Sequence, residues 1–358
     1  MTKEMEVIAT VTSVEAAERL YRACAPDYFR VNASHMDTAS LGAFCAAYGA
    51  VPGLSAVPLY IDLQGAKLRV HAVQPLVHVA PGDRVALVCV PDDATSVPAP
   101  QPETDGASEG NEGSEEKAIY VTENILRLLA PGTEVGIDDA RVLLAVETVE
   151  ADGRRASATV RRGGAVRPRK GFNLRPHPVT FTALSARDRA HVAATRAHAF
   201  VRYALSFACL PSEVAELRAL AGAEKAVAVK LERPLADDAA VALGAAAREL
   251  WLCRGDMGAQ LGAPGALAVY YRGFCARVLP RLRAAGCRVV MAGEVLDHMC
   301  GAEEPTRSEV CHLADLHERG FAAIVVSNET AYGRHPVEVL RTFRDVAHAL
   351  ATDSTLTE

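Results

Sequence analysis

Short apolar runs alternate with amphipathic segments along most of this chain. The runs are rich in β-branched residues, which is typical of strands buried on both faces of a parallel sheet, and apolar positions between most of them recur at helical spacing. Strand–helix alternation repeated eight times predicts the α/β class and a (β/α)8 TIM barrel. The expected strands are 7–11, 29–32, 59–62, 204–207, 226–232, 250–256, 288–294 and 322–329, and the expected helices include 13–24, 211–222, 235–248, 265–285 and 309–318.

The third strand–helix unit is interrupted by a long insertion. About 100 residues separate Arg69 from Lys170, whereas such loops ordinarily have about 2–6 residues. Their apolar and polar residues alternate as in β-strands, with turns at 81–83, 131–133 and 151–153. We therefore expect a small β-barrel lid domain at 70–170, inserted between barrel segments 1–69 and 171–358.

One stretch of this insertion has almost no large apolar residue. Residues 92–116 read DDATSVPAPQPETDGASEGNEGSEE, with eight acidic residues and no basic one. Such a segment cannot bury enough surface to offset its ordering entropy, so we expect an acidic flexible loop. We also expect its deletion to leave the fold and activity nearly unchanged.

Composition and charge narrow the classes of partner. The net charge of −6 argues against nucleic-acid binding through bulk charge. No apolar run is long enough for a membrane span, and the first residues lack the apolar core of a signal peptide. The nine cysteines are scattered without a CxxC pair, so we interpret them as reduced core cysteines of a cytoplasmic protein and not as disulfides or zinc ligands.

Polar residues gather where the expected strands end, which is where chemistry gathers in such barrels. Carboxylates with cations nearby suit Mg²⁺ bound together with an anionic substrate. A structural ion-pair network at the barrel rim is the alternative. The candidates are Arg30, Asn32, Ser34, His35, Asp62, Ser206, Lys230, Glu232, Arg254, Gly255, Asp256, Glu294 and residues 327–330.

Several longer motifs occur in a fixed order. They are FRVNASH (29–35), LYIDLQGAKLR (59–69), IDDARV (137–142), RKGFNL (169–174), ALSF (204–207), VKLE (229–232), LCRGDMG (252–258), PTRSEV (305–310) and VVSNETAYGRHPVEV (325–339). In these motifs and their order, the chain resembles the pyruvate kinase family over nearly its whole length. The resemblance implies phosphoryl transfer between phosphoenolpyruvate and ADP, giving pyruvate and ATP, in a cytoplasmic enzyme.

The resemblance also implies roles for single residues. Glu232 and Asp256 would hold Mg²⁺ or Mn²⁺ chelated by phosphoenolpyruvate. Lys230 would stabilise the transferring phosphoryl group, Arg30 would bind its phosphate, and the N–H groups around Gly255 would take the substrate carboxylate.

A second set of matching residues concerns the nucleotide. Arg69 and Lys170, at the two junctions of the insertion, would face the nucleotide phosphates. Asp139 and His35 would lie nearby, and Ser206 on the fourth strand completes the candidate set.

The family's monovalent-cation site is altered. Asn32, Ser34 and Asp62 match its ligands, but Leu63 stands where the family has threonine and Lys67 where it has glutamate. A lysine there marks family members that do not need K⁺, because its ammonium can supply the missing charge. We predict a K⁺-independent site.

Three further departures bear on activity. Gly293 replaces the threonine near which the enolate is protonated; Glu294 is a candidate to compensate, or it pairs with a neighbouring cation. The Gly-Pro-Ala-Ser loop that packs on the nucleotide is absent from residues 9–18. The chain ends at Glu358 without the family's C-terminal domain. We therefore expect neither sugar-phosphate regulation nor tetramer contacts through that domain. A homodimer remains an alternative.

Three functions remain in competition. The first is transfer between phosphoenolpyruvate and ADP. The second is another reaction at the same Mg²⁺–enolate site, such as decarboxylation of a 2-oxo acid, aldol cleavage or phosphoryl transfer to a different acceptor, in a specialised biosynthetic pathway. The third is a non-catalytic binding protein. ADP binding separates the first from the second, and binding of Mg²⁺ with oxalate separates both from the third.

Overall fold

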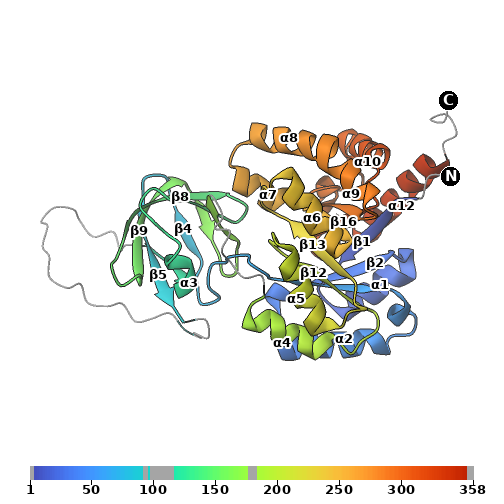
Figure 1. Cartoon of the computed structure of the whole chain (residues 1–358), viewed down its shortest axis with the longest axis horizontal. Helices are drawn as coiled ribbons and strands as arrows, with labels where there is room; N and C mark the ends of the chain where they lie inside the picture. The colour runs from blue at the N-terminus through green and yellow to red at the C-terminus, as the bar shows by residue number, and fades with distance from the viewer. Residues whose placement is uncertain (1–3, 92–95, 97–116, 176–183, 353–358) are drawn as a thin grey trace, which may run out of the picture. The chain divides into compact units, whose positions relative to one another are not determined.

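The computed structural model describes residues 4–91, 96, 117–175 and 184–352, and its chain divides into two compact units (Figure 1). The first unit comprises residues 1–66 and 180–358, and the second comprises residues 67–179. The predicted acidic loop at 92–116 lies outside the described residues, apart from Ser96. Within the described residues, no helix is long and apolar enough to cross a membrane.

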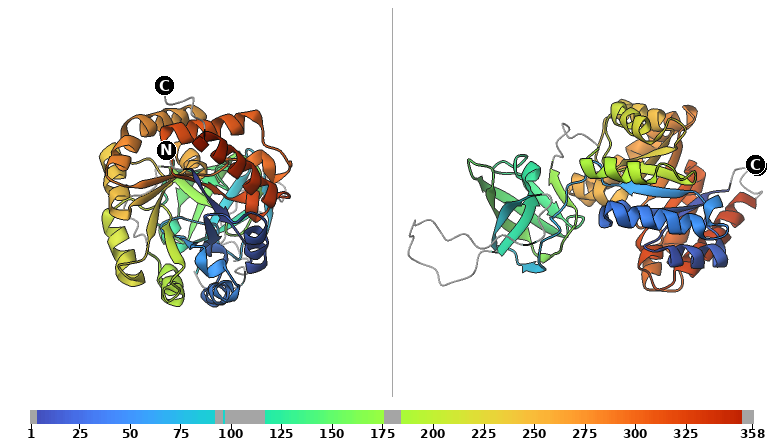
Figure 2. Two further views of the ribbon diagram at one scale, coloured as in Figure 1. Left: turned by 90° about the vertical axis from the view of Figure 1, so that its right-hand side faces the viewer. Right: turned by 90° about the horizontal axis from the view of Figure 1, so that it is seen from below.

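The first unit is a closed barrel of eight parallel strands, which confirms the predicted fold class. The strands pair around the barrel in the order β1-β16-β15-β14-β13-β12-β3-β2. A view along this unit shows the helices ringing the strands (Figure 2). The strands are β1 Glu6–Thr10, β2 Tyr28–Asn32, β3 Leu59–Leu63, β12 Val201–Leu205, β13 Val227–Leu231, β14 Glu249–Cys253, β15 Arg288–Ala292 and β16 Ala323–Val326.

The helices around the barrel match the predicted amphipathic segments. The outer helices are α1 Val14–Cys24, α2 Thr38–Ala50, α4 Ala186–Thr195, α5 Pro211–Ala221, α6 Asp237–Ala247, α8 Pro264–Gly273, α9 Leu279–Ala284, α10 Arg307–Arg319 and α12 Pro336–Thr352. Short helical segments in the loops are η1 Ala33–His35, η2 Leu54–Ala56, α7 Arg254–Leu261, η4 Asp297–Cys300 and α11 Asn328–Ala331.

The single helix expected at 265–285 is divided in the structure. A π-helical turn, η3 Phe274–Val278, separates α8 from α9. Pro280 follows this turn and has no N–H to donate to the carbonyl one turn earlier. A wider turn accommodates this missing hydrogen bond, which explains the break in the regular helix.

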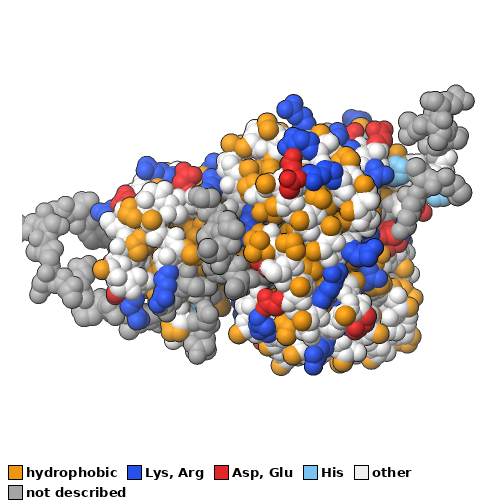
Figure 3. Space-filling model, viewed as in Figure 1, with side chains coloured by type: hydrophobic (Ala, Val, Ile, Leu, Met, Phe, Trp, Pro, Cys, Tyr) orange, Lys and Arg blue, Asp and Glu red, His pale blue; other side chains and the backbone are white. Residues whose placement is uncertain are grey.

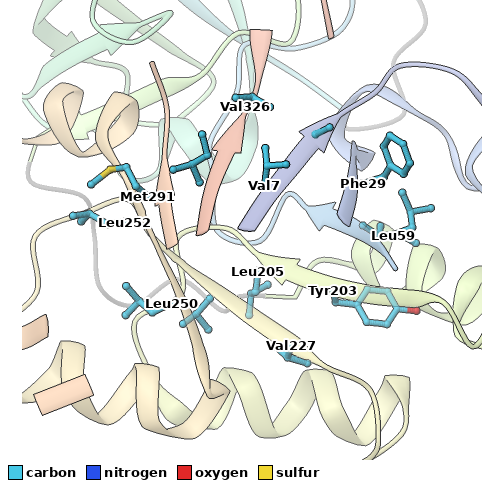
Figure 4. Packing of buried hydrophobic residues seen from close by; sticks show 14 of the residues in the cluster. Val7, Phe29, Leu59, Tyr203, Leu205, Val227, Leu250, Leu252, Met291 and Val326 are labelled. Atoms are coloured by element: carbon cyan, nitrogen blue, oxygen red, sulfur yellow. The ribbon is translucent and has the colours of Figure 1, made fainter. Parts of the chain in front are cut away.

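Both faces of the barrel strands are buried, which is why the strands read as continuous apolar runs. Val7, Phe29 and Leu59 face the helices and pack in the main core (Figure 4). The alternate residues form a second cluster, in which the Tyr60 and Trp251 rings meet edge to face at 5.1 Å. The barrel interior is therefore a packed core and not a channel.

Six barrel strands end earlier than the sequence predicted, and in four of them this places an acidic residue beyond the strand. Glu232, Asp256, Glu294 and Glu329 were expected on strands, but they follow the ends of β13, β14, β15 and β16. The backbone leaves the extended conformation at once: α7 begins directly after β14, and Glu294 has a φ of 53°. The fourth strand was also placed too late, because it begins at Val201.

The second unit is built of β-structure. A curled six-stranded sheet has the order β11-β7-β8-β9-β5-β6, and a two-stranded sheet pairs β10 with β4. The predicted turns are confirmed, because Gly82, Gly132 and Gly153 adopt the left-handed conformation, with φ of 90°, 86° and 66°. The elements are β4 Val77–Val79, β5 Arg84–Val90, β6 Lys117–Thr122, α3 Glu123–Leu126, β7 Glu134–Ile137, β8 Val142–Val149, β9 Arg155–Arg162, β10 Gly164–Val166 and β11 Phe172–Arg175.

Strand pairing leads us to revise the expectation that residues 92–116 can be deleted without effect. β5 and β6 are parallel, with Val85 beside Lys117 and Val90 beside Thr122. The chain that leaves Val90 must therefore return along the strand, about 17 Å at ~3.3 Å per residue, before β6 begins. Complete deletion would leave only Pro91 to cover that distance.

We predict that deleting residues 92–116 breaks the β5–β6 pairing and lowers the midpoint of thermal unfolding. Replacing them with a Gly/Ser linker of about ten residues should preserve both, because ~3.3 Å per residue then covers the distance. Thermal unfolding of both variants checks this. Equal stability of the complete deletion and the parent chain would contradict it.

Candidate active site at the carboxyl ends of the barrel strands

Asp62, near the carboxyl end of β3, is the centre of a buried network of charged and polar side chains. Arg30 Nε donates a hydrogen bond to Asp62 Oδ2 at 2.8 Å. Asp62 Oδ1 accepts hydrogen bonds from Ser206 Oγ at 3.1 Å and from Lys230 Nζ at 3.2 Å. Arg30 lies within β2, Ser206 directly follows β12 and Lys230 is the last residue but one of β13. Both β2 and β12 pair with β3. The parallel register thus brings together four residues predicted from sequence.

Lys230 is held between two carboxylates. Its Nζ lies 3.1 Å from Asp62 Oδ2 and 3.1 Å from Glu232 Oε1, and it donates to Ser206 Oγ at 2.9 Å. Burial alone would lower the pKa of Lys230, but Asp62 and Glu232 outweigh it and raise the pKa above its ordinary value. The ammonium therefore stays charged at neutral pH, near the carboxyl end of β13.

Asp62 stays ionised for the reciprocal reason. Burial would raise its pKa, but the charges of Lys230 and Arg30 and their hydrogen bonds hold the pKa at about 2. The remaining Arg30 nitrogen, Nη1, donates to Thr10 Oγ1 at 2.9 Å, so the guanidinium is fixed on two sides. These contacts fix the position of Arg30 relative to Asp62 and Thr10.

Glu232 connects two loops at the mouth of the barrel. Its Oε2 accepts a hydrogen bond from the Phe207 backbone N–H at 2.9 Å. Phe207 is buried with a φ of 57°, which is uncommon for a residue other than glycine. This conformation directs the N–H towards Glu232 and fixes the carboxylate whose other oxygen meets Lys230.

Asp256 lies on the first turn of α7, directly after β14, and its side chain is 7% exposed. Burial, and then Glu232, Asp62 and Asp256 among the nearby charges, raise the pKa of the Cys253 thiol well above its ordinary value. The charges of these three carboxylates therefore all act on this one thiol. Gly255 and Asp256 belong to the first turn of α7, and the N-terminus of a helix is a favourable place for an anion.

The loop after β15 carries Glu294, which is exposed. Gly293 has a φ of 92° and Glu294 a φ of 53°. The Arg254 guanidinium holds this conformation: its Nη2 donates to the carbonyl oxygens of Gly293 at 2.6 Å and of Glu294 at 2.9 Å. Arg254 thus bonds to the backbone of this loop, and the side chain of Glu294 stays accessible to solvent.

Asn32, Ser34 and His35 lie together where β2 passes into η1. Asn32 Oδ1 accepts from the Ser34 backbone N–H at 3.1 Å and caps this short helix. Ser34 is buried, and His35 is the last residue of the helix. The structure thus uses the Asn32 side chain to shape the loop beside Arg30.

Four predicted site residues belong to the second unit. Lys170 Nζ lies 2.9 Å from Asp138 Oδ1, and Asp139 follows in a left-handed turn with a φ of 55°. Arg69 Nη1 donates to the Arg169 carbonyl oxygen at 2.8 Å, and Arg69 pairs with Gly171 in an antiparallel bridge. The Lys67 side chain lies over Gly171: its Cε is 3.3 Å from where a Cβ on that glycine would stand. The two ends of the insertion therefore lie side by side within this unit.

The donor set fits a hard divalent cation that is completed by its substrate. Among the described residues, no group of three or more His, Cys, Asp or Glu side chains could hold a metal ion. Glu232 and Asp256 offer two buried carboxylates, and Mg²⁺ is commonly held by one or two carboxylates with waters and substrate oxygens. The net charge of the site is −1, from three carboxylates (Asp62, Glu232 and Asp256) and two cations (Lys230 and Arg30). A divalent cation would make this net charge positive, which favours an anionic ligand.

The comparison with known families rests on nearly the whole chain. The sequence model described as "Pyruvate kinase, barrel domain" matches residues 3–340. The chain belongs to the pyruvate kinase family. It is 29% identical to the pyruvate kinase of Methylorubrum extorquens over 99% of this chain and 70% of that protein. It is also 29% identical to the pyruvate kinase of Mycobacterium tuberculosis over 99% of this chain and 72% of that protein.

Sequence reasoning placed residues 327–330 among the candidates but gave them no role in this pyruvate-kinase-like site. Thr330 Oγ1 accepts from the Thr10 N–H at 3.0 Å, which joins the first and last strands beside Arg30. Glu329 is 1% exposed, and its carboxylate accepts from the N–H groups of Ser327 and Leu296. Burial raises the pKa of Glu329. Their place at the end of the last expected strand indicated Glu329 and Thr330 as candidates, but not the backbone groups that they bind.

Proposed function

We propose that this chain transfers a phosphoryl group between phosphoenolpyruvate and ADP, giving pyruvate and ATP. The observation that carries the proposal is the buried Lys230 ammonium, held charged between Asp62 and Glu232 beside Arg30. Phosphoryl transfer needs charge neutralisation and positioning more than covalent chemistry, and this network supplies both.

The proposed reaction divides its work among these groups. The bond between the phosphorus and the enol oxygen breaks, and a bond forms to a terminal oxygen of ADP. Lys230 and Arg30 neutralise the moving phosphoryl group, and the N–H groups of the first turn of α7 bind the substrate carboxylate. Mg²⁺ or Mn²⁺ held by Glu232 and Asp256 would stabilise the enolate that remains.

The enolate carbon must then gain a proton. We propose that Glu294 or solvent supplies it, because the Glu294 side chain is exposed and can exchange protons with water. For the nucleotide, we propose that Arg69, Lys170, Asp139 and His35 bind ADP, as the match to the family's motifs indicates.

A second candidate is a different reaction at the same site, on a 2-oxo acid or with another phosphoryl acceptor. It is favoured by Gly293, which has no hydroxyl group, and by the altered segment after β1. Calorimetry of the full chain with Mg²⁺ and oxalate, and then with ADP, separates the candidates. Binding of both supports the kinase; oxalate binding without ADP binding favours the second candidate; failure of both rejects an enzyme of this type.

We further propose that catalysis does not require K⁺, since Lys67 follows Asp62 by five residues where the family has glutamate. We predict that Lys67→Glu lowers activity without K⁺ by about tenfold or more, because one lost charge interaction costs over a kcal/mol, and that added K⁺ restores it. Steady-state rates with and without K⁺ check this. Equal rates of the variant and parent chain in both conditions would contradict it.

A further inference from the structure

Asp188, on the first turn of α4, has no role in the chemistry described so far, yet its side chain is 1% exposed. Its carboxylate accepts hydrogen bonds from the N–H groups of Gln64 at 3.1 Å and Gly65 at 3.0 Å. The Ser185 side chain caps the helix by accepting from the Asp188 N–H at 3.1 Å. One buried carboxylate thus binds two successive N–H groups of a turn that begins two residues after Asp62.

The turn itself leaves no room for a different conformation. Gly65 has a φ of 55°, and a Cβ built on it would lie 2.1 Å from the Ser206 carbonyl oxygen. The backbone after β3 is therefore pressed against the backbone after β12, which carries the Ser206 hydroxyl that contacts both Asp62 and Lys230. A displacement of Gly65 would displace Ser206 and the ammonium it positions.

The same helical turn reaches the loop after β2. The Arg187 guanidinium donates to the carbonyl oxygens of Met36 and Ser34, the latter at 3.4 Å. Adjacent residues of α4 thus fix the backbone that follows β2 and the backbone that follows β3. Arg30 and Asp62 lie within these two strands, two residues and one residue before their ends.

The charge at Asp188 is costly, which argues against a purely space-filling role. Burial outweighs the surrounding hydrogen bonds and raises the pKa of Asp188 to about 6. A neutral side chain would avoid this cost, but it would offer fewer acceptor lone pairs to two N–H groups that point at one place. The carboxylate is the group that satisfies both.

We propose that Asp188 is a positioning residue: it fixes the Gln64–Gly65 turn against Ser206 and thereby holds Asp62 and Lys230 in register for the reaction. The same contact fixes the chain just before Lys67, where the second unit begins. The effect on catalysis rests on the proposed function, but the fixing of the Gln64–Gly65 turn by Asp188 does not.

The test compares Asp188→Asn with Glu309→Gln in the full chain. Glu309 is a matched control, because its carboxylate also binds loop N–H groups, those of Thr306 and His298, from the first turn of a barrel helix. We expect Asp188→Asn to lower kcat by about tenfold or more, because small displacements of reacting groups strongly reduce the rate. The KM for phosphoenolpyruvate should change by less than about threefold. Glu309→Gln should leave kcat within about twofold.

Hydrogen exchange gives a readout that needs no activity. A peptide covering Gln64 and Gly65 should exchange at least about tenfold faster in Asp188→Asn than in the parent chain, and no faster in Glu309→Gln. Unchanged exchange and unchanged kcat would overturn the proposal. If the parent chain turns over no phosphoenolpyruvate, but exchange is faster in Asp188→Asn, the proposed function is rejected. The fixing of the turn by Asp188 is then still supported.

Gly65→Ala provides a second variant that leaves Asp188 in place. Its methyl group would push the turn away from Ser206, so the expected result is the same fall in kcat. A normal kcat in this variant would contradict the link between the turn and Lys230.

Discussion

Replacing Lys230 with methionine should lower the rate of phosphoryl transfer from phosphoenolpyruvate by roughly 10²–10³-fold or more, the usual effect of removing one group that stabilises transition-state charge. Methionine keeps the length of the side chain but removes the ammonium. Asp62 would keep its bond to Arg30, and Glu232 its bond to the Phe207 N–H. The carboxylates that we assign to the cation would therefore stay in place.

The measurement for Lys230→Met combines turnover with calorimetry of Mg²⁺ and oxalate. We expect turnover to be lost and oxalate binding to change by less than about tenfold. Lys225→Met is a matched control, because Lys225 precedes β13 and donates to the His198 carbonyl oxygen at the opposite end of the strand. Equal losses of turnover and oxalate binding would remove Lys230 from its catalytic role.

Replacing Asp62 with asparagine should have the second largest effect. Asparagine keeps one acceptor oxygen but turns an NH₂ group towards Arg30 or Lys230, both of which only donate. Removing one partner of a buried ion pair typically costs about 3–5 kcal/mol. We expect a fall in the midpoint of thermal unfolding and a loss of turnover of about 10²-fold, since Lys230 would lose a carboxylate that positions it.

The pH dependence of stability provides a second signature of Asp62. Its pKa is about 2 in the folded chain, below the ordinary value of 3.8. Its contribution to stability, about 2 kcal/mol at ~1.4 kcal/mol per pKa unit, is therefore full above the unfolded pKa and is lost as the pH falls towards 2.

Asp62→Asn should reduce the fall in the free energy of unfolding at acid pH (the acid limb), measured by urea titrations at pH 2–5. Asp237→Asn, which breaks an exposed pair with Arg277, is the control and should change stability by less than about 1 kcal/mol. An acid limb unchanged in Asp62→Asn would contradict the assignment.

The barrel could be predicted from sequence because burial on both faces leaves a clear signal of short β-branched runs separated by helices. The strand ends could not be placed from the same signal. Glu232, Asp256 and Glu294 read as continuations of apolar runs. Their departure from the sheet depends on backbone conformations that side-chain type does not reveal, such as the φ of 53° at Glu294.

The candidate site was predicted in part for a similar reason. Parallel pairing brings Arg30, Asp62 and Lys230 together, since each lies within the last three residues of its own strand. Asp188 could not be predicted, because its carboxylate acts on a turn more than 100 residues earlier in the chain. The β5–β6 pairing was missed too, because the alternation of apolar and polar residues does not reveal whether two strands pair in parallel.

On the face that Figure 3 shows, basic and acidic side chains are interspersed over the barrel unit. That the chain does not bind nucleic acid through bulk charge stays a prediction.

Phosphorus NMR of the purified full chain with Mg²⁺, phosphoenolpyruvate and ADP, in a buffer without K⁺, tests the central claim most directly. The proposed function predicts that the phosphoenolpyruvate signal falls while the three signals of ATP rise, and that neither change occurs with Lys230→Met. Phosphoenolpyruvate that stays intact with the parent chain, while oxalate still binds with Mg²⁺, would contradict the kinase and direct attention to other 2-oxo acids and other acceptors.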